Sequence, residues 1–403
     1  MYKIKIFSRI KNLIRKELIN IFFISLACIF FILDLFIKKK KKLIVFSQKN
    51  NLYSDNSKSF FEFININQKN FEAVWFVHNL ETKKKILLEN KNAKIKLLKS
   101  LDGIKTLLEA KTVVTSNSLH DFFPYFIPSF RKEAIQLWHG IKWTKHFEYP
   151  NNNFTKQLTI ICASSESHKE LIYKQNVLDP QKVYVTGLPR NDKFFQNKKD
   201  LIKSKLAEFL REPNKKIILY APTQKEDLVA SFFPFKDINI DELNKFLEKE
   251  NFIIFLRPHI NDTNKDQEKW KNLLNRTNVK NIKPLSFKEL EDINLILPLV
   301  NILITDYSTI YTDSLLLNIP TIFIPYDYDI YEKKRGFVYK FDEIAVGPKV
   351  FSQKEFLESI MKIKMNRNHY INIQEKIKKK FHLYEDGLSS NRIIEVLNSK
   401  LNK

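Results

Sequence analysis

The chain has 403 residues, a formal net charge of +23 and only two cysteines. This length favours two domains over one, and two cysteines exclude both a disulfide framework and a cysteine-rich metal site. The charge favours an anionic partner such as a membrane surface, a polyphosphate polymer or a nucleotide. We expect no nucleic acid as a partner, because the lysines are dispersed and no nucleic-acid-binding module is recognised.

Residues 1–42 predict a membrane-associating helix with basic flanks. Residues 18–37 form an apolar run that is long enough to cross the hydrocarbon core, and lysines 38–42 follow it directly. Basic residues also precede the run, so a monotopic helix is an alternative to a single span. We expect a peripheral, monotopic or single-pass protein at the cytoplasmic face of the cell membrane, with Asp34 at the interface. A buried core helix is the competing interpretation.

After residue 42, short apolar strands alternate with helical stretches, which predicts parallel sheets with helices on both faces. We therefore expect an α/β fold with two Rossmann-like doubly wound domains that face a cleft, an N-terminal domain at 43–195 and a C-terminal domain at 196–403. In such sheets, ligands bind beyond the carboxyl ends of the strands. The predicted strands are 43–46, 73–77, 95–98, 112–115, 134–138 and 158–163, then 216–220, 252–256, 302–304 and 321–324.

His139 ends one of these apolar runs and is followed by Gly140, one of only six glycines in the chain. Glycine permits close approach of the backbone to a ligand. A histidine at the end of a strand can accept a proton near neutral pH. A half-buried structural histidine is the competing interpretation for this pattern taken alone.

Further strand ends present groups that suit an anion. An arginine fork can bind a phosphate at two points, and hydroxyls at a helix start can bind an anion together with backbone N–H groups. Surface arginines and ordinary helix caps are the competing interpretations. The residues concerned are Arg190, Pro222, Thr223, Arg257, Pro258, His259, Ser308 and Thr309. No carboxylate cluster is evident, so we expect no metal-binding residues and no required cofactor, with Mg²⁺ left open as an assisting ion.

In this order, the segments resemble the CDP-glycerol glycerophosphotransferase family, the teichoic-acid primases and polymerases. The resemblance extends over residues 43–395 and implies a GT-B fold with a CDP-alcohol in the cleft between the domains. It also implies transfer of a polyol phosphate to a hydroxyl, with release of CMP. The matching segments are Tyr53 to Asn56, Trp138 to Gly140, Thr186 to Asp192, Tyr220 to Thr223, Arg257 to His259, Thr305 to Thr309, Pro325 to Asp327, Glu332 to Gly336 and Tyr384 to Gly387.

The resemblance also implies roles for individual residues. His139 is similar to the base that takes the proton of the acceptor hydroxyl, with His259 as the competing candidate. Asp313 is similar to a donor contact made through polyol or ribose hydroxyls. The remaining donor-site residues implied are Gly140, Arg190, Pro222, Thr223, Arg257, Pro258, Ser308 and Thr309, with His259 among the ligands of the pyrophosphate.

Two departures from the family pattern leave the substrates open. Residues 142–145 read Lys-Trp-Thr-Lys where the family often has Pro-Leu-Lys, and Gln224-Lys225 replaces an aromatic residue and an arginine. CDP-glycerol is the expected donor, and CDP-ribitol is also compatible with the pattern. The acceptor is expected to be a cell-surface glycan or a lipid-linked hydroxyl, and primase, polymerase and single-transfer roles on a capsule or glycan all remain open. A GT-B nucleotide-sugar glycosyltransferase and a non-enzymatic binder of anionic polymers compete with this assignment.

Overall fold

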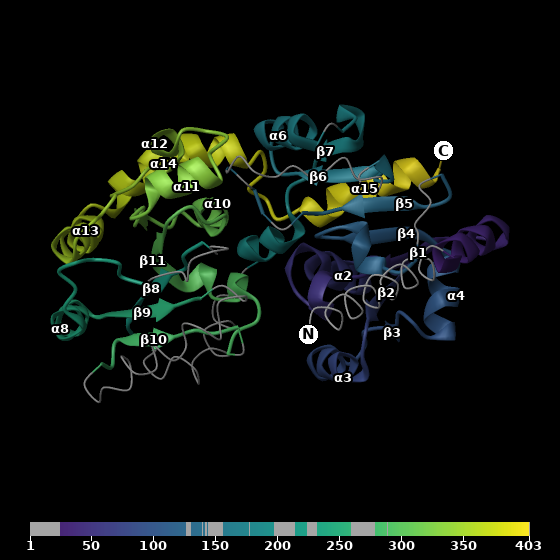
Figure 1. Ribbon diagram of the computed structural model, residues 1–403, viewed down its shortest axis with the longest axis horizontal. Helices are drawn as coiled ribbons and strands as arrows, with labels where there is room; N and C mark the ends of the chain where they lie inside the picture. The colour runs from purple at the N-terminus through teal and green to yellow at the C-terminus, as the bar shows by residue number, and fades with distance from the viewer. Residues whose placement is uncertain are drawn as a thin grey trace, which may run out of the picture.

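The computed structural model describes residues 25–125, 130–138, 140–141, 143, 156–176, 178–196, 214–223, 232–258, 279–287 and 289–402. Two parallel sheets lie in separate lobes (Figure 1). The first sheet has the order β3-β2-β1-β4-β5-β6-β7 and the second has the order β10-β9-β8-β11-β12. The predicted α/β class with two parallel sheets is therefore confirmed.

The strands of the first sheet are β1 (Lys40–Phe46), β2 (Glu72–Val77), β3 (Ile95–Leu97), β4 (Ala110–Thr115), β5 (Glu133–Gln136), β6 (Ile160–Ala163) and β7 (Val183–Val185). Those of the second sheet are β8 (Lys216–Tyr220), β9 (Phe252–Leu256), β10 (Ile282–Pro284), β11 (Val300–Thr305) and β12 (Thr321–Phe323). Strands β7 and β10 were not predicted from the sequence. Both are only three residues long and lie at the edges of their sheets.

Both faces of the first sheet are buried, which explains its uninterrupted apolar strands. Along β1, Leu43 and Val45 belong to one hydrophobic cluster, whereas Ile44 and Phe46 belong to another on the opposite face. Because successive side chains of a strand point to opposite faces, this alternation means that helices or loops cover both sides. The second sheet is built in the same way, with alternate residues of β8 in two clusters.

Helices follow the strands in both lobes. The first lobe contains α2 (Asp55–Asn67), α3 (Leu80–Glu89), α4 (Leu101–Glu109) and α6 (Glu166–Asn176). The second contains α8 (Ile240–Glu250), α10 (Ile310–Leu316), α11 (Tyr328–Lys334), α12 (Phe341–Ile344), α13 (Gln353–Met365) and α14 (Arg367–Phe381). Short 3₁₀ helices are η1 (Lys49–Asn51), η2 (Leu119–Phe122), η3 (Pro180–Lys182), η4 (Pro189–Phe195), η6 (Ile293–Leu295) and η7 (Leu297–Leu299).

The C-terminal helix α15 (Ser389–Leu401) lies on the first lobe, although the sequence analysis placed it in the C-terminal domain (Figure 1). Its apolar residues Ile393 and Leu397 pack in the same cluster as Ile44. Asp192 fixes its start, because this carboxylate accepts the N–H groups of Ser389 and Ser390, each at 2.9 Å. The chain therefore returns to the first lobe after α14.

The N-terminal boundary also differs from the expected one at residue 42. Strand β1 begins at Lys40, and residues 25–36 are helical. Asp34 is buried and pairs with Lys39 at 2.7 Å and with Lys132 at 2.9 Å, so its expected position at a membrane interface is wrong. Deletion of residues 1–42 would remove part of β1 and leave the buried Lys132 ammonium without its carboxylate, which is costly.

Residues 18–24 of the predicted apolar run lie outside the described residues. None of the helices in the described part of the chain is long and apolar enough to cross a membrane.

Candidate functional site

The segment around Gly140 passes from one lobe to the other. Trp138 packs in a cluster of the first lobe, whereas Ile141 and Trp143 pack in a cluster that is mainly second-lobe core. The Trp143 indole stacks on Phe337, with ring centroids 5.6 Å apart. The backbone carbonyl of Trp143 accepts the N–H of Val338 at 3.0 Å. The turn before Gly140 is thus fixed in one lobe and the residues after it in the other. His139 and His259 lie outside the described residues.

Gly140 brings groups from both lobes into contact. Its φ of +137° lies in a region that side chains rarely allow. A Cβ atom at this position would lie 3.0 Å from the Thr309 hydroxyl oxygen and 3.2 Å from a terminal nitrogen of Arg190. The structure therefore places three of the predicted site residues next to one another.

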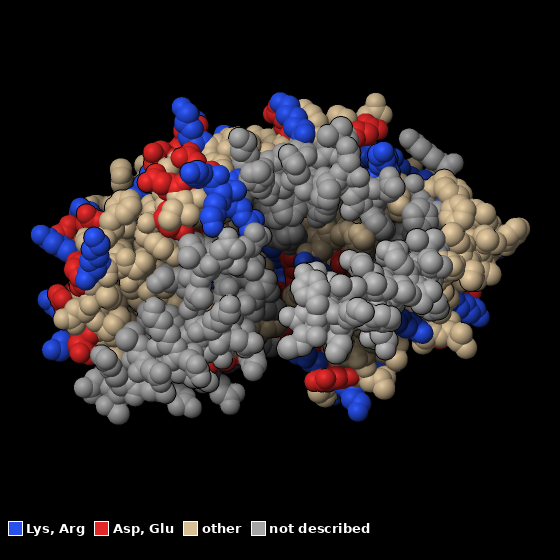
Figure 2. All heavy atoms as spheres, in the orientation of Figure 1, with Lys and Arg blue, Asp and Glu red and all other residues tan. Residues whose placement is uncertain are grey.

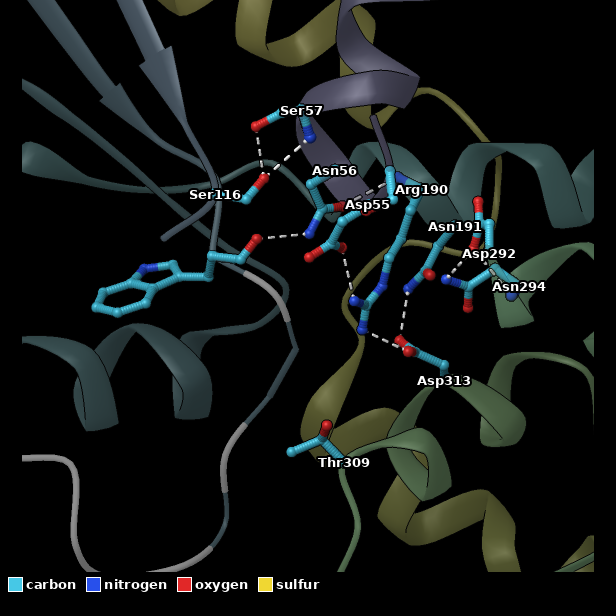
Figure 3. Close-up of polar contacts among 12 residues, drawn as sticks. Asp55, Asn56, Ser57, Ser116, Arg190, Asn191, Asp292, Asn294, Thr309 and Asp313 are labelled. Carbon is cyan, nitrogen blue, oxygen red and sulfur yellow. Dashed lines mark hydrogen bonds and ion pairs between the residues drawn. The ribbon is translucent and has the colours of Figure 1, made fainter. Parts of the chain in front are cut away.

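Arg190, in η4, joins acidic groups of both lobes (Figure 3). Its buried guanidinium donates to Asp55 at 2.8 Å and to Asp313 at 2.5 Å. Asn191 donates to the other oxygen of the Asp313 carboxylate at 3.2 Å. Burial alone would lower the pKa of Arg190, but Asp313 and Asp55 together raise it above its ordinary value. Burial raises the pKa of Asp313, and Arg190 partly offsets this.

The hydrogen bonds to Asp55 and Asp313 bear on the predicted role of Arg190 as a pyrophosphate ligand. Among the described residues, two carboxylates share the Arg190 guanidinium and so compete with a pyrophosphate for its N–H groups. The predicted role of Arg190 as a pyrophosphate ligand stays a prediction, and the side-chain hydrogen bonds described for it go to Asp55 and Asp313. Asp55 received no role in the sequence analysis. Asp55 follows β1 in the chain and lies in a segment that matches the family, and these two features could have marked it as a site residue.

Thr223 and Asp306 connect two strand ends of the second lobe. The N–H and the hydroxyl of Thr223 donate to the same Asp306 oxygen at 2.7 and 2.6 Å. The N–H of Tyr307 also donates to this oxygen, at 2.6 Å. Asp306 therefore holds the loops after β8 and β11 together, with the half-buried Ser308 and Thr309 directly following. Pro222 is buried beside Thr223.

Arg257 supports the loop after β10. Its guanidinium donates to the carbonyl oxygens of Ser286 at 3.0 Å and Glu291 at 3.2 Å, and it lies over the Phe287 ring. Burial lowers the pKa of Arg257 to about 10. These hydrogen bonds go to the loop after β10 and not to the Arg190 network. Pro258, the residue after Arg257, is buried. The predicted contact of Arg257 with a donor pyrophosphate stays a prediction.

The face drawn in Figure 2 is hollowed where the lobes meet, and basic and acidic atoms are visible in the hollow. Within the described ranges, no three His, Cys, Asp or Glu side chains come together in a way that could hold a metal ion. The described residues thus define a protein of two parallel α/β lobes in which polar groups of both lobes meet between them.

The chain belongs to the CDP-glycerol:poly(glycerophosphate) glycerophosphotransferase family, whose sequence profile matches residues 29–399. The chain is 28% identical to a teichoic acid poly(ribitol-phosphate) polymerase of Bacillus spizizenii, over 76% of this chain and 51% of that protein. It is 27% identical to a teichoic acid poly(glycerol phosphate) polymerase of the same organism, over 92% of this chain and 95% of that protein.

A solved structure of the wall teichoic acid polymerase TagF has a similar fold. It superposes with a TM-score of 0.75 at 22% identity, and covers 97% of this chain and 98% of that one. The resemblance stated from the sequence segments is thus confirmed at the level of the family. The match to the ribitol-phosphate polymerase spans only about half of that longer protein.

Proposed function

We propose that the protein is a membrane-associated transferase that moves glycerol phosphate from CDP-glycerol to a hydroxyl of a cell-surface glycan or lipid-linked acceptor, releasing CMP. The observation that supports it best is the close approach of Thr309 and Arg190 to Gly140, which brings three family segments from both lobes together. In this proposal the lobes form a GT-B arrangement, with the donor between them and His139 next to the Gly140 turn.

The chemistry needs positioning and charge neutralisation more than covalent help. In the proposal, His139 takes the proton of the acceptor hydroxyl. The hydroxyls of Ser308 and Thr309 face the pyrophosphate, where donors placed in advance stabilise developing charge. Arg190 and Asn191 hold one Asp313 oxygen each, so the carboxylate is fixed and its remaining lone pairs suit polyol hydroxyls. Arg257 shapes the neighbouring loop.

The donor is tested by a panel of CDP-glycerol, CDP-ribitol and UDP- or CMP-sugars, offered with lipid-linked acceptors. We expect CMP release from a CDP-polyol, with CDP-glycerol the better donor. Faster turnover of CDP-ribitol would move the assignment to ribitol phosphate, which the ribitol-phosphate polymerase relative keeps open. Turnover of a nucleotide sugar with no CMP release from either polyol donor would contradict the proposal, as would the absence of release from any donor.

Membrane association is supported by an exposed apolar surface on the first lobe. Ile32 and Phe36 of the helical residues 25–36 are 53% and 83% exposed, and Phe130 is 66% exposed. Phe31 contacts Phe130 through its ring, so the helix and this residue lie side by side. Exposed lysines follow directly at 38 and 40–42. Apolar side chains beside lysines suit the interface of an anionic bilayer.

Replacing Ile32 and Phe36 together by aspartate is expected to weaken binding to phosphatidylglycerol vesicles by at least about tenfold. Full burial of such a side chain contributes roughly 1.5–3 kcal/mol, and the new charges also face anionic lipid. Vesicle sedimentation measures the change. Phe351→Asp is the matched control, because Phe351 is 60% exposed but lies just before α13 in the second lobe. Equal sedimentation of the double variant and the control would contradict the membrane assignment of this surface.

A further inference from the structure

The backbone directly before His139 has an unfavourable conformation. Trp138 has a φ of +60°, in the left-handed region that bulky residues rarely adopt. Such a conformation persists only where the surrounding structure holds it, and it is enriched at functional sites. The contacts of the Trp138 peptide group therefore show what holds this turn.

A buried side-chain amide contacts this turn. The Asn56 side chain donates to the Trp138 carbonyl oxygen at 2.8 Å, and its own oxygen accepts the backbone N–H of Arg190 at 3.0 Å. Asn56 is 0% exposed. Both ends of its amide are thus used, one on the turn and one on η4, as Figure 3 shows for the Arg190 side. Such burial shields these hydrogen bonds from competition by solvent.

Asn56 is itself held firmly. It lies in the first turn of α2, and the next residue, Ser57, donates its N–H to the Ser116 hydroxyl at 2.9 Å. The two hydroxyls of Ser57 and Ser116 are 2.7 Å apart. Ser116 follows β4, so the start of α2 is anchored to the carboxyl edge of the first sheet. A rigid support of this kind can impose a backbone geometry on the loop that it contacts.

The hydrogen bond from Asn56 to the Trp138 carbonyl oxygen affects the whole peptide group and not the oxygen alone. Because the peptide unit is planar, a hydrogen bond to the Trp138 oxygen restrains the plane of the peptide bond that follows Trp138. We propose that Asn56 is a positioning residue for the transfer, which sets His139 through the Trp138 peptide group. This inference rests on the proposed function, in which His139 takes the acceptor proton.

Asn56→Asp tests the proposal. The carboxylate keeps the shape and can still accept the Arg190 N–H, but it cannot donate to the Trp138 oxygen and places a negative charge against it. We expect kcat to fall about 10- to 100-fold, with the donor KM within about twofold of wild type, as befits one buried hydrogen bond. A wild-type kcat in a folded Asn56→Asp protein would overturn the proposal. So would a raised donor KM at unchanged kcat.

A matched control separates positioning from a general loss of stability. Asn281 is also buried, at 1% exposure, and its amide donates to the Asn244 carbonyl at 3.3 Å in the second lobe. Asn281→Asp is expected to lower the Tm while leaving kcat unchanged. If both variants lose kcat in proportion to their loss of Tm, Asn56 has only a structural role.

Two further measurements sharpen the test, and the second of them does not depend on the activity assay. If Asn56 acts through His139, the double variant Asn56→Asp His139→Ala is no slower than His139→Ala alone, and additive losses would overturn the proposal. Amide hydrogen exchange of the peptide spanning residues 137–141 is expected to speed up in Asn56→Asp but not in Asn281→Asp. Unchanged exchange in Asn56→Asp would overturn the positioning role of Asn56. Failure of the wild type to release CMP from any donor would refute the proposed function, and the exchange measurement would still test Asn56.

Discussion

Replacement of Arg190 by methionine is expected to lower the free energy of unfolding by about 3–5 kcal/mol, the usual cost of removing one partner of a buried ion pair. Asp313 is only 2% exposed, and both it and Asp55 use the Arg190 guanidinium as their cation. The variant would leave two carboxylates close together in a poorly hydrated place. Denaturant unfolding measures the loss.

The pH dependence of this loss has a definite sign. Burial already raises the pKa of Asp313, and removal of Arg190 raises it further. A raised carboxyl pKa in the folded state contributes stability that is present at low pH and is lost as the pH rises through the folded pKa. The deficit of Arg190→Met is therefore expected to shrink on acidification. Adding Asp313→Asn should likewise recover part of it at neutral pH.

Arg392→Met is the matched control for Arg190→Met. Arg392 also pairs with an aspartate, Asp386, but the two side chains are 20% and 39% exposed, and ion pairs that water can reach contribute about 1 kcal/mol or less. Similar losses in the two variants would contradict a special role of the network between the lobes.

Replacement of His139 by alanine is expected to lower kcat by about 10²–10⁴, the usual range for loss of a general base. Donor affinity should change little, because the turn that precedes Gly140 belongs to the first lobe, on the acceptor side in the proposal. His139→Gln should not restore the rate, since an amide cannot take a proton. Steady-state CMP release and calorimetric donor binding provide the two readouts.

His259→Ala is the comparison for His139→Ala and is expected to raise the donor KM. A nearly normal kcat in His139→Ala, together with an inactive His259→Ala of normal donor affinity, would exchange the two roles.

Much of the fold could be predicted from the sequence, because strands buried on both faces must be continuously apolar. Residues 252–256 are all apolar and form β9, and the predicted strand at 112–115 lies within β4. The signal failed for β10, whose three residues include a lysine and a proline. A proline is tolerated there because β10 is an edge strand. The predicted C-terminal domain at 196–403 likewise included residues 389–401, which form α15 on the first lobe, because the sequence does not say which lobe receives a helix.

The sequence by itself determined the two parallel sheets, the family, and the loops that contribute to the site, because local patterning and ordered segments encode these. Only the tertiary structure decided which groups pair. Arg190 lies 135 residues from Asp55 and 123 residues from Asp313, and no local pattern specifies contacts at such separations. The same holds for Asn56 and Trp138, 82 residues apart. The sequence determines the charge and the hydrogen-bonding groups of each residue. The tertiary packing determines the partner, because a buried polar group must bond to the groups that the fold places beside it.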